Sequence, residues 1–340
     1  MFQAVAKIEL RLRLTGIKPS VTNQSALQVQ QRVILQTTVQ SSVAFHGVGL
    51  HSGHSACATI LPAGPGQGIV FRRTDLGPAH SDIPALWDHV NQSPLCTRLE
   101  NAHGATVSTV EHIMAALIGC GIHNATVEID GPEIPILDGS SAIFVREILS
   151  RGVHRTDAPL RALRILSPVE VTRGSARARL TPHDTLLIEF AIEFEDAAIG
   201  TQKKSLNMSN GSFVRELSTS RTFCRKADVD MMRANGLALG GTLENAVVVD
   251  GERILSPGGL RHADEAVRHK MLDAVGDLGL AGFPILGHYH GLRAGHALTN
   301  DLLRAVFAQP ECYEIVECDE QMAARLPGAD VHWNEIPEVA

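Results

Sequence analysis

Four acidic or histidine side chains recur every four residues between positions 265 and 277. If this stretch is helical, Glu265, His269, Asp273 and Asp277 stand in one row. Like charges at that spacing destabilise a helix by about 0.2 to 0.5 kcal/mol per pair, and a bound cation would relieve the repulsion. His269 and Asp273 can reach one ion from a single helix, and imidazole with carboxylate suits zinc. An ordinary His–Asp pair on a helix surface is the alternative.

A second pair of residues that could take part in catalysis or metal binding is Glu111 and His112, at the start of an apolar run. Ser108-Thr-Val-Glu111 matches a capping box, in which the glutamate bonds back to the residue that caps the helix. His112, however, enters the run IMAALI, where an unpaired imidazole is costly to bury. If His112 shares one zinc ion with His269 and Asp273, a fourth position stays open for water, and Glu111 can take a proton from that water.

His296 lies near the expected start of the last helix, directly after Gly295. The helix dipole disfavours a charged imidazole at that end, so His296 needs a carboxylate partner if it is to act as an acid. Asp277, at the far end of the acidic row, is the candidate partner. A purely structural histidine is the alternative.

The elements that must position these residues follow from the hydrophobic pattern. Runs rich in β-branched residues, separated by turns with glycine or serine, predict strands. The order of strands, helix, strand and helix occurs twice along the chain. In the first half we expect strands in 33–42, 54–61 and 68–73, then helix 108–121, strand 123–130 and helix 140–150. After a linker at 157–159 we expect strands in 163–172, 176–181 and 185–194, then helix 263–279, strand 283–290 and helix 299–308.

This repeat predicts an α+β protein with two pseudo-repeated domains of similar topology, 33–156 and 160–309, packed as layers. A segment around 221–250 has no counterpart in the first half and is expected to be an insert with exposed apolar side chains. Residues 1–32 predict a poorly ordered extension, with a transit peptide as the alternative. The acid-rich tail 310–340 predicts a solvated appendage.

Composition limits the possible partners. The chain has 30 Lys and Arg against 37 Asp and Glu, which gives a formal charge of −7. This net charge provides no general electrostatic attraction to nucleic acid or anionic lipid. A ligand that carries phosphate would need a local basic pocket. No stretch approaches the ~18 apolar residues of a membrane span, and the six cysteines include no CxxC pair. We therefore expect a cytoplasmic monomer with reduced thiols and without stable membrane insertion.

Several strings, in this order and spacing, resemble the UDP-3-O-acyl-N-acetylglucosamine deacetylases, a family of zinc amidases in lipid A synthesis. The resemblance covers about residues 32 to 308, and STVEH with RHKMLDAVGDL is its most specific part. The strings are FHGVGLHSG, RRTDL, LCTRLENAHGATVSTVEHIMAAL, GPEIPILDGSSAIFV, SRTF, LALGGTLENAVVVD, AVRHKMLDAVGDLGLAG and GHALTNDLLRAV.

The resemblance implies two pseudo-repeated two-layer α/β sandwich domains with the zinc site between them. It also implies roles for individual residues and a substrate, an acylated UDP-sugar. It implies hydrolysis of the N-acetyl group of UDP-3-O-acyl-N-acetylglucosamine, which gives acetate and the free amine. The implied zinc (Zn2+) ligands are His112, His269 and Asp273; the implied catalytic residues are Glu111 as general base, His296 as general acid oriented by Asp277, and Thr222 with its hydroxyl on the oxyanion side. Acid–base work by Glu111 alone, and iron in place of zinc, remain open.

The resemblance also places substrate contacts. The implied contacts near the metal are His51, Lys270 and a strand with Leu95 and Cys96. Phe223, with Met232 and Leu237 of the insert, matches an apolar passage for the acyl chain.

Two features depart from the family pattern. Cys224 stands where the family often has a small or apolar residue, and His288 and His290 are expected close to the site without an assigned role. Another zinc amidohydrolase on the same fold, or a non-enzymatic module that binds nucleotide sugars, are the competing functions.

Overall fold

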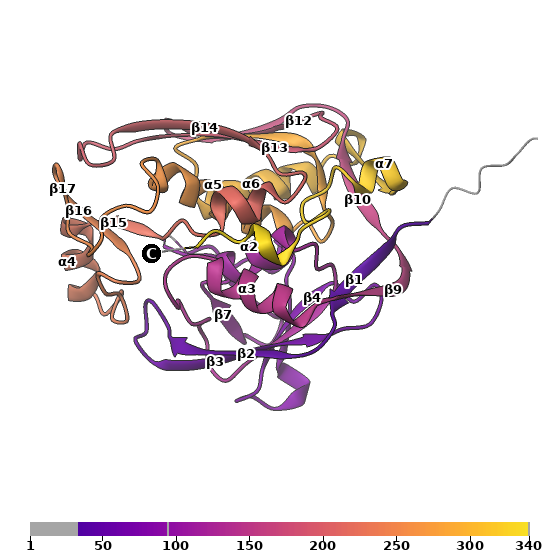
Figure 1. Cartoon of the computed structure of the whole chain (residues 1–340), viewed down its shortest axis with the longest axis horizontal. Coiled ribbons are helices and arrows are strands. Elements are labelled where there is room, and N and C mark those ends of the chain that lie inside the picture. The colour runs from indigo at the N-terminus through magenta and orange to yellow at the C-terminus, as the bar shows by residue number, and fades with distance from the viewer. Residues whose placement is uncertain (1–32, 94, 339–340) are drawn as a thin grey trace, which may run out of the picture. The chain divides into compact units, whose positions relative to one another are not determined.

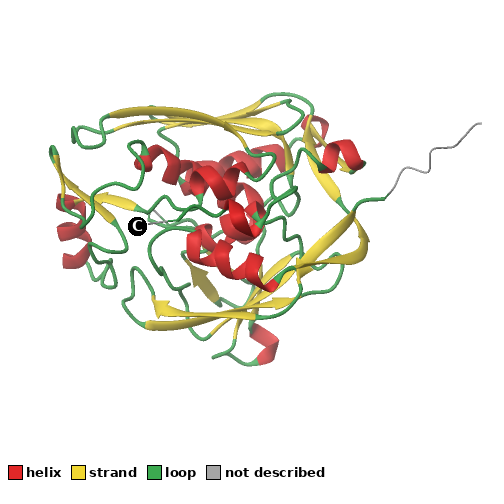
Figure 2. Ribbon diagram, in the orientation of Figure 1, coloured by secondary structure: helices red, strands yellow, loops and turns green. Residues whose placement is uncertain are grey.

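The computed structural model describes residues 33–93 and 95–338, and these residues belong to one compact unit. The extension expected over residues 1–32 lies outside the described part. Two sheets form the outer layers of this unit, and the helices α2, α3, α5 and α6 lie between them (Figures 1 and 2). The protein is therefore of the mixed α+β class that the sequence predicts.

The first half builds a five-stranded sheet with the order β2-β3-β8-β4-β5. β4 and β8 run parallel, while the other neighbours are antiparallel. The bounds are β2 Val43–Val48, β3 Ser55–Pro62, β4 Ile69–Arg73, β5 Asp82–Pro84 and β8 Ala125–Ile129; a separate pair consists of β6 Arg98–Glu100 and β7 Thr106–Ser108.

The second half builds a seven-stranded sheet around β18, which pairs with β12 on one side and β10 on the other and also with β13. In β13 alternate side chains are buried, because successive residues of a strand face opposite sides of the sheet. The bounds are β10 Arg161–Ile165, β11 Val169–Arg173, β12 Ala176–Thr181, β13 Leu186–Glu193, β14 Thr201–Asn207, β18 Ile285–Leu292 and β19 Tyr313–Glu317.

The helices form the inner layers. Eight of the nine residues of α2 are buried, as expected for a helix that is apolar on every side. Both halves end in the predicted order, which is α2, β8 and α3 in the first and α5, β18 and α6 in the second. The bounds are α2 Glu111–Gly119, α3 Ala142–Arg151, α5 Glu265–Gly279 and α6 His296–Phe307. The division into domains 33–156 and 160–309 stays a prediction.

Two segments differ from the sequence expectations. The expected linker 157–159 belongs to strand β9 (Val153–Pro159), which pairs with β1 (Leu35–Val39). The solvated character expected of the tail is wrong for its first part, because β19 is hydrogen-bonded to β10 along five residue pairs. Behind β19, Cys318 and Leu326 are buried in a small apolar cluster, and α7 (Glu320–Ala323) follows. The acids of β19 lie on a sheet edge, where solvent reaches them.

The expected insert forms a small structure of its own at one end of this unit (Figure 1). It comprises β15 (Phe223–Arg225), α4 (Lys226–Ala234) and β16 (Val247–Asp250), and β17 (Arg253–Ile254) completes its three-stranded sheet. No residue of α4 is buried. Across residues 33–93 and 95–338, none of the helices combines the length and the apolar character that crossing a membrane requires.

Candidate active site

The site begins where α2 crosses α5. Gly276 lies at the crossing, and a Cβ added there would stand 2.1 Å from the carbonyl oxygen of Glu111. One turn further along α5, a Cβ on Gly279 would stand 2.7 Å from a side-chain carbon of Ile118. The two glycines therefore allow the helix backbones to touch, and this contact brings residues of both halves of the chain together.

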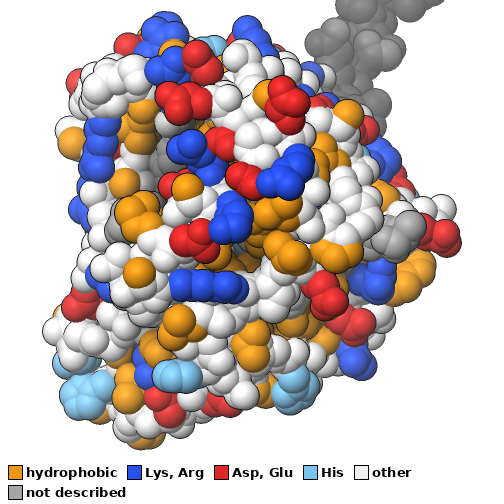
Figure 3. All heavy atoms as spheres, turned by 90° about the vertical axis from the view of Figure 1, so that its left-hand side faces the viewer, with side chains coloured by type: hydrophobic (Ala, Val, Ile, Leu, Met, Phe, Trp, Pro, Cys, Tyr) orange, Lys and Arg blue, Asp and Glu red, His pale blue; other side chains and the backbone are white. Residues whose placement is uncertain are grey.

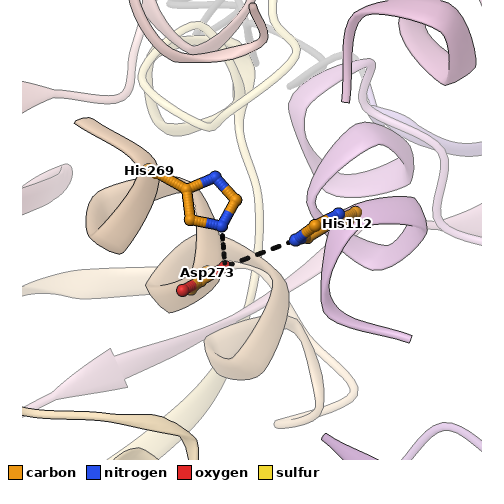
Figure 4. A group of neighbouring side chains, drawn as sticks. All are labelled: His112, His269 and Asp273. Atoms are coloured by element: carbon orange, nitrogen blue, oxygen red, sulfur yellow. Dashed lines mark ion pairs between the residues drawn. The ribbon is translucent and has the colours of Figure 1, made fainter. Parts of the chain in front are cut away.

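His112 from α2 faces His269 and Asp273 from α5 (Figure 4). The two imidazole rings lie edge to face with centroids 5.0 Å apart. Oδ1 of Asp273 is 3.2 Å from Nε2 of His269 and 3.7 Å from Nε2 of His112. One donor atom from each of the three residues lies within 4.8 Å of the others, and all three residues are buried. The expected metal ligands thus converge on one point.

The chemistry of these three side chains fits a metal ion. Oδ1 of Asp273, which lies between the two imidazoles, is buried without a hydrogen-bond partner among the described residues, although buried polar atoms are normally paired. Burial, followed by the neighbouring His269, lowers the pKa of His112 to about 3, so this ring is neutral and can act as a ligand. Two imidazoles and a carboxylate are a donor set that suits zinc.

Two further contacts orient the ligands. Nδ1 of His269 lies 3.0 Å from the carbonyl oxygen of Ser220, and this bond directs Nε2 toward Asp273. Lys270 donates to Oδ2 of Asp273 at 2.7 Å. Burial alone would raise the pKa of Asp273, but His269 and Lys270 outweigh it and hold that pKa well below the ordinary value. Asp273 is therefore a carboxylate at neutral pH.

Glu111 does not form the capping box that its sequence context allows. Ser108 lies in β7, and α2 begins without a side-chain cap. Oε2 of Glu111 instead accepts a hydrogen bond from the backbone N–H of Thr97 at 3.0 Å. Burial raises the pKa of Glu111 to about 7; Asp273 and Asp277 also raise it, while His296 opposes them. A carboxyl group with this pKa can accept a proton near neutral pH.

His296 is the first residue of α6, and its Nδ1 lies 2.8 Å from Oδ2 of Asp277. Its Nε2 points into the site, 3.9 Å from Glu111 and 4.0 Å from Asp273. Burial by itself lowers the pKa of His296, but the charges of Asp277 and Glu111 outweigh it and raise the pKa to about 9. The partner expected from the acidic row is the observed one, and the imidazole is charged at neutral pH.

Three supporting contacts have no signal in the sequence. Thr97 contacts both Glu111 and Asp277, because its N–H donates to Glu111 while its hydroxyl donates to Asp277 at 2.5 Å. Glu133 accepts from the backbone N–H of His51 at 2.7 Å and so fixes that turn. Glu265, which we expected to add to the repulsion in the acidic row, is instead paired with the buried guanidinium of Arg221.

A cavity of about 950 Å³ opens over two of the expected metal ligands, His269 and Asp273. Six of the predicted site residues line it beside His269, Asp273 and His296; they are His51, Leu95, Thr222, Phe223, Met232 and Lys270. Apolar and basic side chains surround a hollow on the face that carries the insert (Figure 3).

Three placements differ from the expectation. Leu95 and Cys96 lie in a bend before β6 and not in a strand, and Cys96 lies outside the cavity lining. Burial, followed by the charge of Glu111, raises the pKa of the Cys96 thiol to about 12. Leu237 is 37% exposed but also lies outside the lining.

His288 and His290 are not close to the site, which corrects another expectation. They alternate along β18 with Tyr289, whose hydroxyl lies 3.0 Å from that of Thr299 in the helix layer. Because neighbouring residues of a strand face opposite sides, the two histidines lie on the outer face of the sheet.

Comparison with known proteins identifies the family of this chain. The family model for LpxC, UDP-3-O-acyl N-acetylglycosamine deacetylase, matches residues 36–308. The chain belongs to this family. The deacetylase of Idiomarina loihiensis, named UDP-3-O-acyl-N-acetylglucosamine deacetylase, is 47% identical over 86% of this chain and 95% of its own length. Relatives of the same name from Shewanella frigidimarina and Shewanella baltica OS155 are each 45% identical over 88% of this chain and 100% and 99% of their own lengths.

Proposed function

We propose that this deacetylase is zinc-dependent and hydrolyses the N-acetyl group of UDP-3-O-acyl-N-acetylglucosamine, the compound in its relatives' names. One observation carries the proposal. A buried base, Glu111, and a charged acid, His296, face the same point beside the three converging ligand atoms. Amide hydrolysis needs these two groups, since one proton leaves the water and another must reach the departing amine.

His112, His269 and Asp273 would hold the zinc ion. When bound, zinc supplies a Lewis acid that polarises a carbonyl group and makes water more acidic. Glu111 takes the proton of the attacking water, because its raised pKa matches neutral conditions. Thr222 and Lys270 line the same cavity and supply donors to the oxygen that becomes negative.

His296 donates the second proton, from Nε2 to the nitrogen of the departing sugar amine. Asp277 keeps this imidazole charged and fixes its orientation through Nδ1. Glu111 acting alone would also need to reach the leaving nitrogen. A charged imidazole, with its Nε2 3.9 Å from Oε1 of Glu111, is already present to protonate that nitrogen, and this favours two separate groups.

The cavity also suits the two ends of the proposed substrate. Its apolar wall includes Phe194, Phe223, Met231 and Met232, and Met231 is 59% exposed at the insert. A long acyl chain would cover this apolar surface. Basic side chains line the same cavity, where a diphosphate would need them in a chain of net negative charge. Arg173, Arg225, Lys226 and Arg293 are each also paired with a carboxylate, and Arg233 is the fifth.

The test is release of acetate from the acylated nucleotide by protein whose metal content is measured. We expect no turnover after chelation, and turnover restored in proportion to added zinc. A matched nucleotide sugar without the acyl chain should react much more slowly, since each buried methylene contributes about 0.8 kcal/mol. Equal turnover of both compounds would support a different amidohydrolase, and binding without acetate release would support a non-enzymatic module. The cytoplasmic location and the monomeric state stay predictions.

A further inference from the structure

The turn between β2 and β3, residues 49–54, joins the first half of the chain to the insert. The backbone N–H groups of Leu239 and Gly240, both in the insert, donate to the carbonyl oxygens of His51 and Leu50 at 3.2 and 3.0 Å. Two segments that are far apart in the sequence are therefore held together through their backbones.

Both sides of this contact contribute to the wall of the active-site cavity. Leu50 and His51 line the cavity from the turn, and Ala238 and Gly241, which flank the two bonded residues, line it from the insert. Because the two segments meet through backbone groups, a shift of the turn would move the insert side of the wall with it.

Gly240 brings the insert directly against the turn. A Cβ added to Gly240 would stand 2.2 Å from the carbonyl oxygen of Gly49, closer than real Cβ atoms come to any such neighbour. The φ of Gly240 lies outside the left-handed region, so the close approach, and not the backbone conformation, requires glycine here. The turn therefore has no room to move toward the insert.

Glu133 holds the same turn in place. This residue follows β8 and is 5% exposed. Its Oε1 accepts the backbone N–H of His51 at 2.7 Å, and its Oε2 accepts that of Ser52 at 2.9 Å. The hydroxyl of Thr109 also donates to Oε1, at 3.1 Å. A carboxylate suits this position because both of its oxygens only accept hydrogen bonds.

We propose that Glu133 is a positioning residue for substrate specificity. Through the turn 49–54 it sets the place of the insert segment 238–241, and with it the fit of the cavity to the acyl chain. Glu133 does not line the cavity itself, so it acts through the turn. This inference rests on the proposed function, since it concerns the acylated substrate.

Glu133→Gln tests the proposal. The amide keeps the size of the side chain but replaces one acceptor oxygen by a donor, which then faces another donor. We expect kcat/KM for the acylated nucleotide to fall about tenfold relative to that for the nucleotide sugar without the acyl chain, which is the effect of one methylene in an apolar pocket. The loss should lie in KM, while bound zinc stays as in the wild type.

Gly240→Ala disturbs the same contact from the insert side and should lower the same ratio by a similar factor. The double variant Glu133→Gln/Gly240→Ala should lose little more than either single variant, because residues that act through one contact are not additive. The matched control is Glu128→Gln, which removes a carboxylate of β8 that lies 3.9 Å from Arg72 instead. This control should leave the ratio unchanged.

Backbone hydrogen exchange gives a readout that does not need the reaction. Exchange at the N–H groups of Leu239 and Gly240 should be faster in Glu133→Gln, although these groups are bonded to the turn and not to Glu133. Wild-type exchange at these two groups would overturn the proposal. A wild-type preference for the acylated nucleotide in Glu133→Gln, or additive losses in the double variant, would overturn it as well.

Two further arms keep the test decisive. Should Glu133→Gln fail to fold, Glu133→Asp replaces it, because aspartate keeps the charge but withdraws the carboxylate from the turn. A wild type that releases no acetate from either nucleotide would refute the proposed function. The relative affinities of Glu133→Gln for the two nucleotides would then decide the role of Glu133 in place of the rates.

Discussion

Replacing Asp277 by asparagine removes one charge from the acid pair and keeps the size of the side chain. An oxygen remains to accept the hydroxyl of Thr97. His296 acts as an acid only while protonated, so kcat/KM must fall as the pH rises through the pKa of its imidazole. With Asp277 in place that pKa is raised to about 9, and we expect the basic limb of the wild-type profile near this pH.

Without the charge of Asp277, burial becomes the dominant influence on His296, and burial lowers its pKa. The basic limb should then move toward the ordinary value of 6.5. A group with that pKa is only about one-tenth protonated at pH 7.5, so kcat/KM at this pH should fall about tenfold. Asp277 also raises the pKa of Glu111. The acidic limb should therefore move to lower pH as well, and the variant should recover part of its activity when the pH is lowered.

The assay is the initial rate of acetate release between about pH 5.5 and 10, with zinc content measured at each pH. His296→Gln serves as the control, since it should abolish the basic limb and slow turnover without displacing metal. A basic limb that stays in place in both variants would assign it to another group and would leave Glu111 as the only acid–base residue. A uniform loss of activity in Asp277→Asn at every pH would give Asp277 a structural role instead.

Four further predictions follow from the same geometry. His269→Ala should lose tightly bound zinc, measured by metal analysis, because it removes one of three protein ligands; stoichiometric zinc in the purified variant would refute the assignment. Glu111→Ala should keep zinc and lower kcat by on the order of 10² to 10⁴, and near-normal turnover would refute its role as base. Met232→Glu should weaken the acylated substrate far more than one without the acyl chain, whereas Leu237→Glu, outside the cavity lining, is the matched control; equal effects of Met232→Glu on both substrates would argue against an acyl passage. Thr97→Val should lower kcat about tenfold through loss of a hydrogen bond to a charged group, and an unchanged pH profile with full activity would mean that this bond does not position Asp277.

The row formed by three of the candidate site residues could be predicted because their spacing is a local property of one helix. His269, Asp273 and Asp277 share a face of α5 wherever that helix lies. The partnership with His112 could be anticipated from the repeated order of elements, which places α2 and α5 in equivalent positions. The sequence pattern alone left the metal as one of two interpretations, and only the helix contact at Gly276 shows that the three side chains converge.

Tertiary contacts explain what the sequence did not predict. Ser108 matches a capping motif, but it is drawn into β7, and Thr109 adopts a left-handed φ of 58° before α2 begins. Thr97 and Glu133 act through backbone contacts between segments far apart in the chain. Such contacts produce no periodic pattern in the sequence from which they could be predicted. His288 and His290 were misplaced because proximity to α6 in sequence says nothing about which side of a strand a residue faces.

The pairing of β19 with β10 affects how this chain can be shortened. The family model ends at residue 308, before β19 begins at Tyr313. A fragment trimmed to those limits would leave the N–H and C=O groups of β10 open along one side and would uncover Leu160 and Leu286, which pack with Cys318 and Leu326. Exposed strand edges of this kind invite pairing between molecules. Expression of a fragment that stops at residue 308 would therefore favour aggregation even though every residue of the active site is retained.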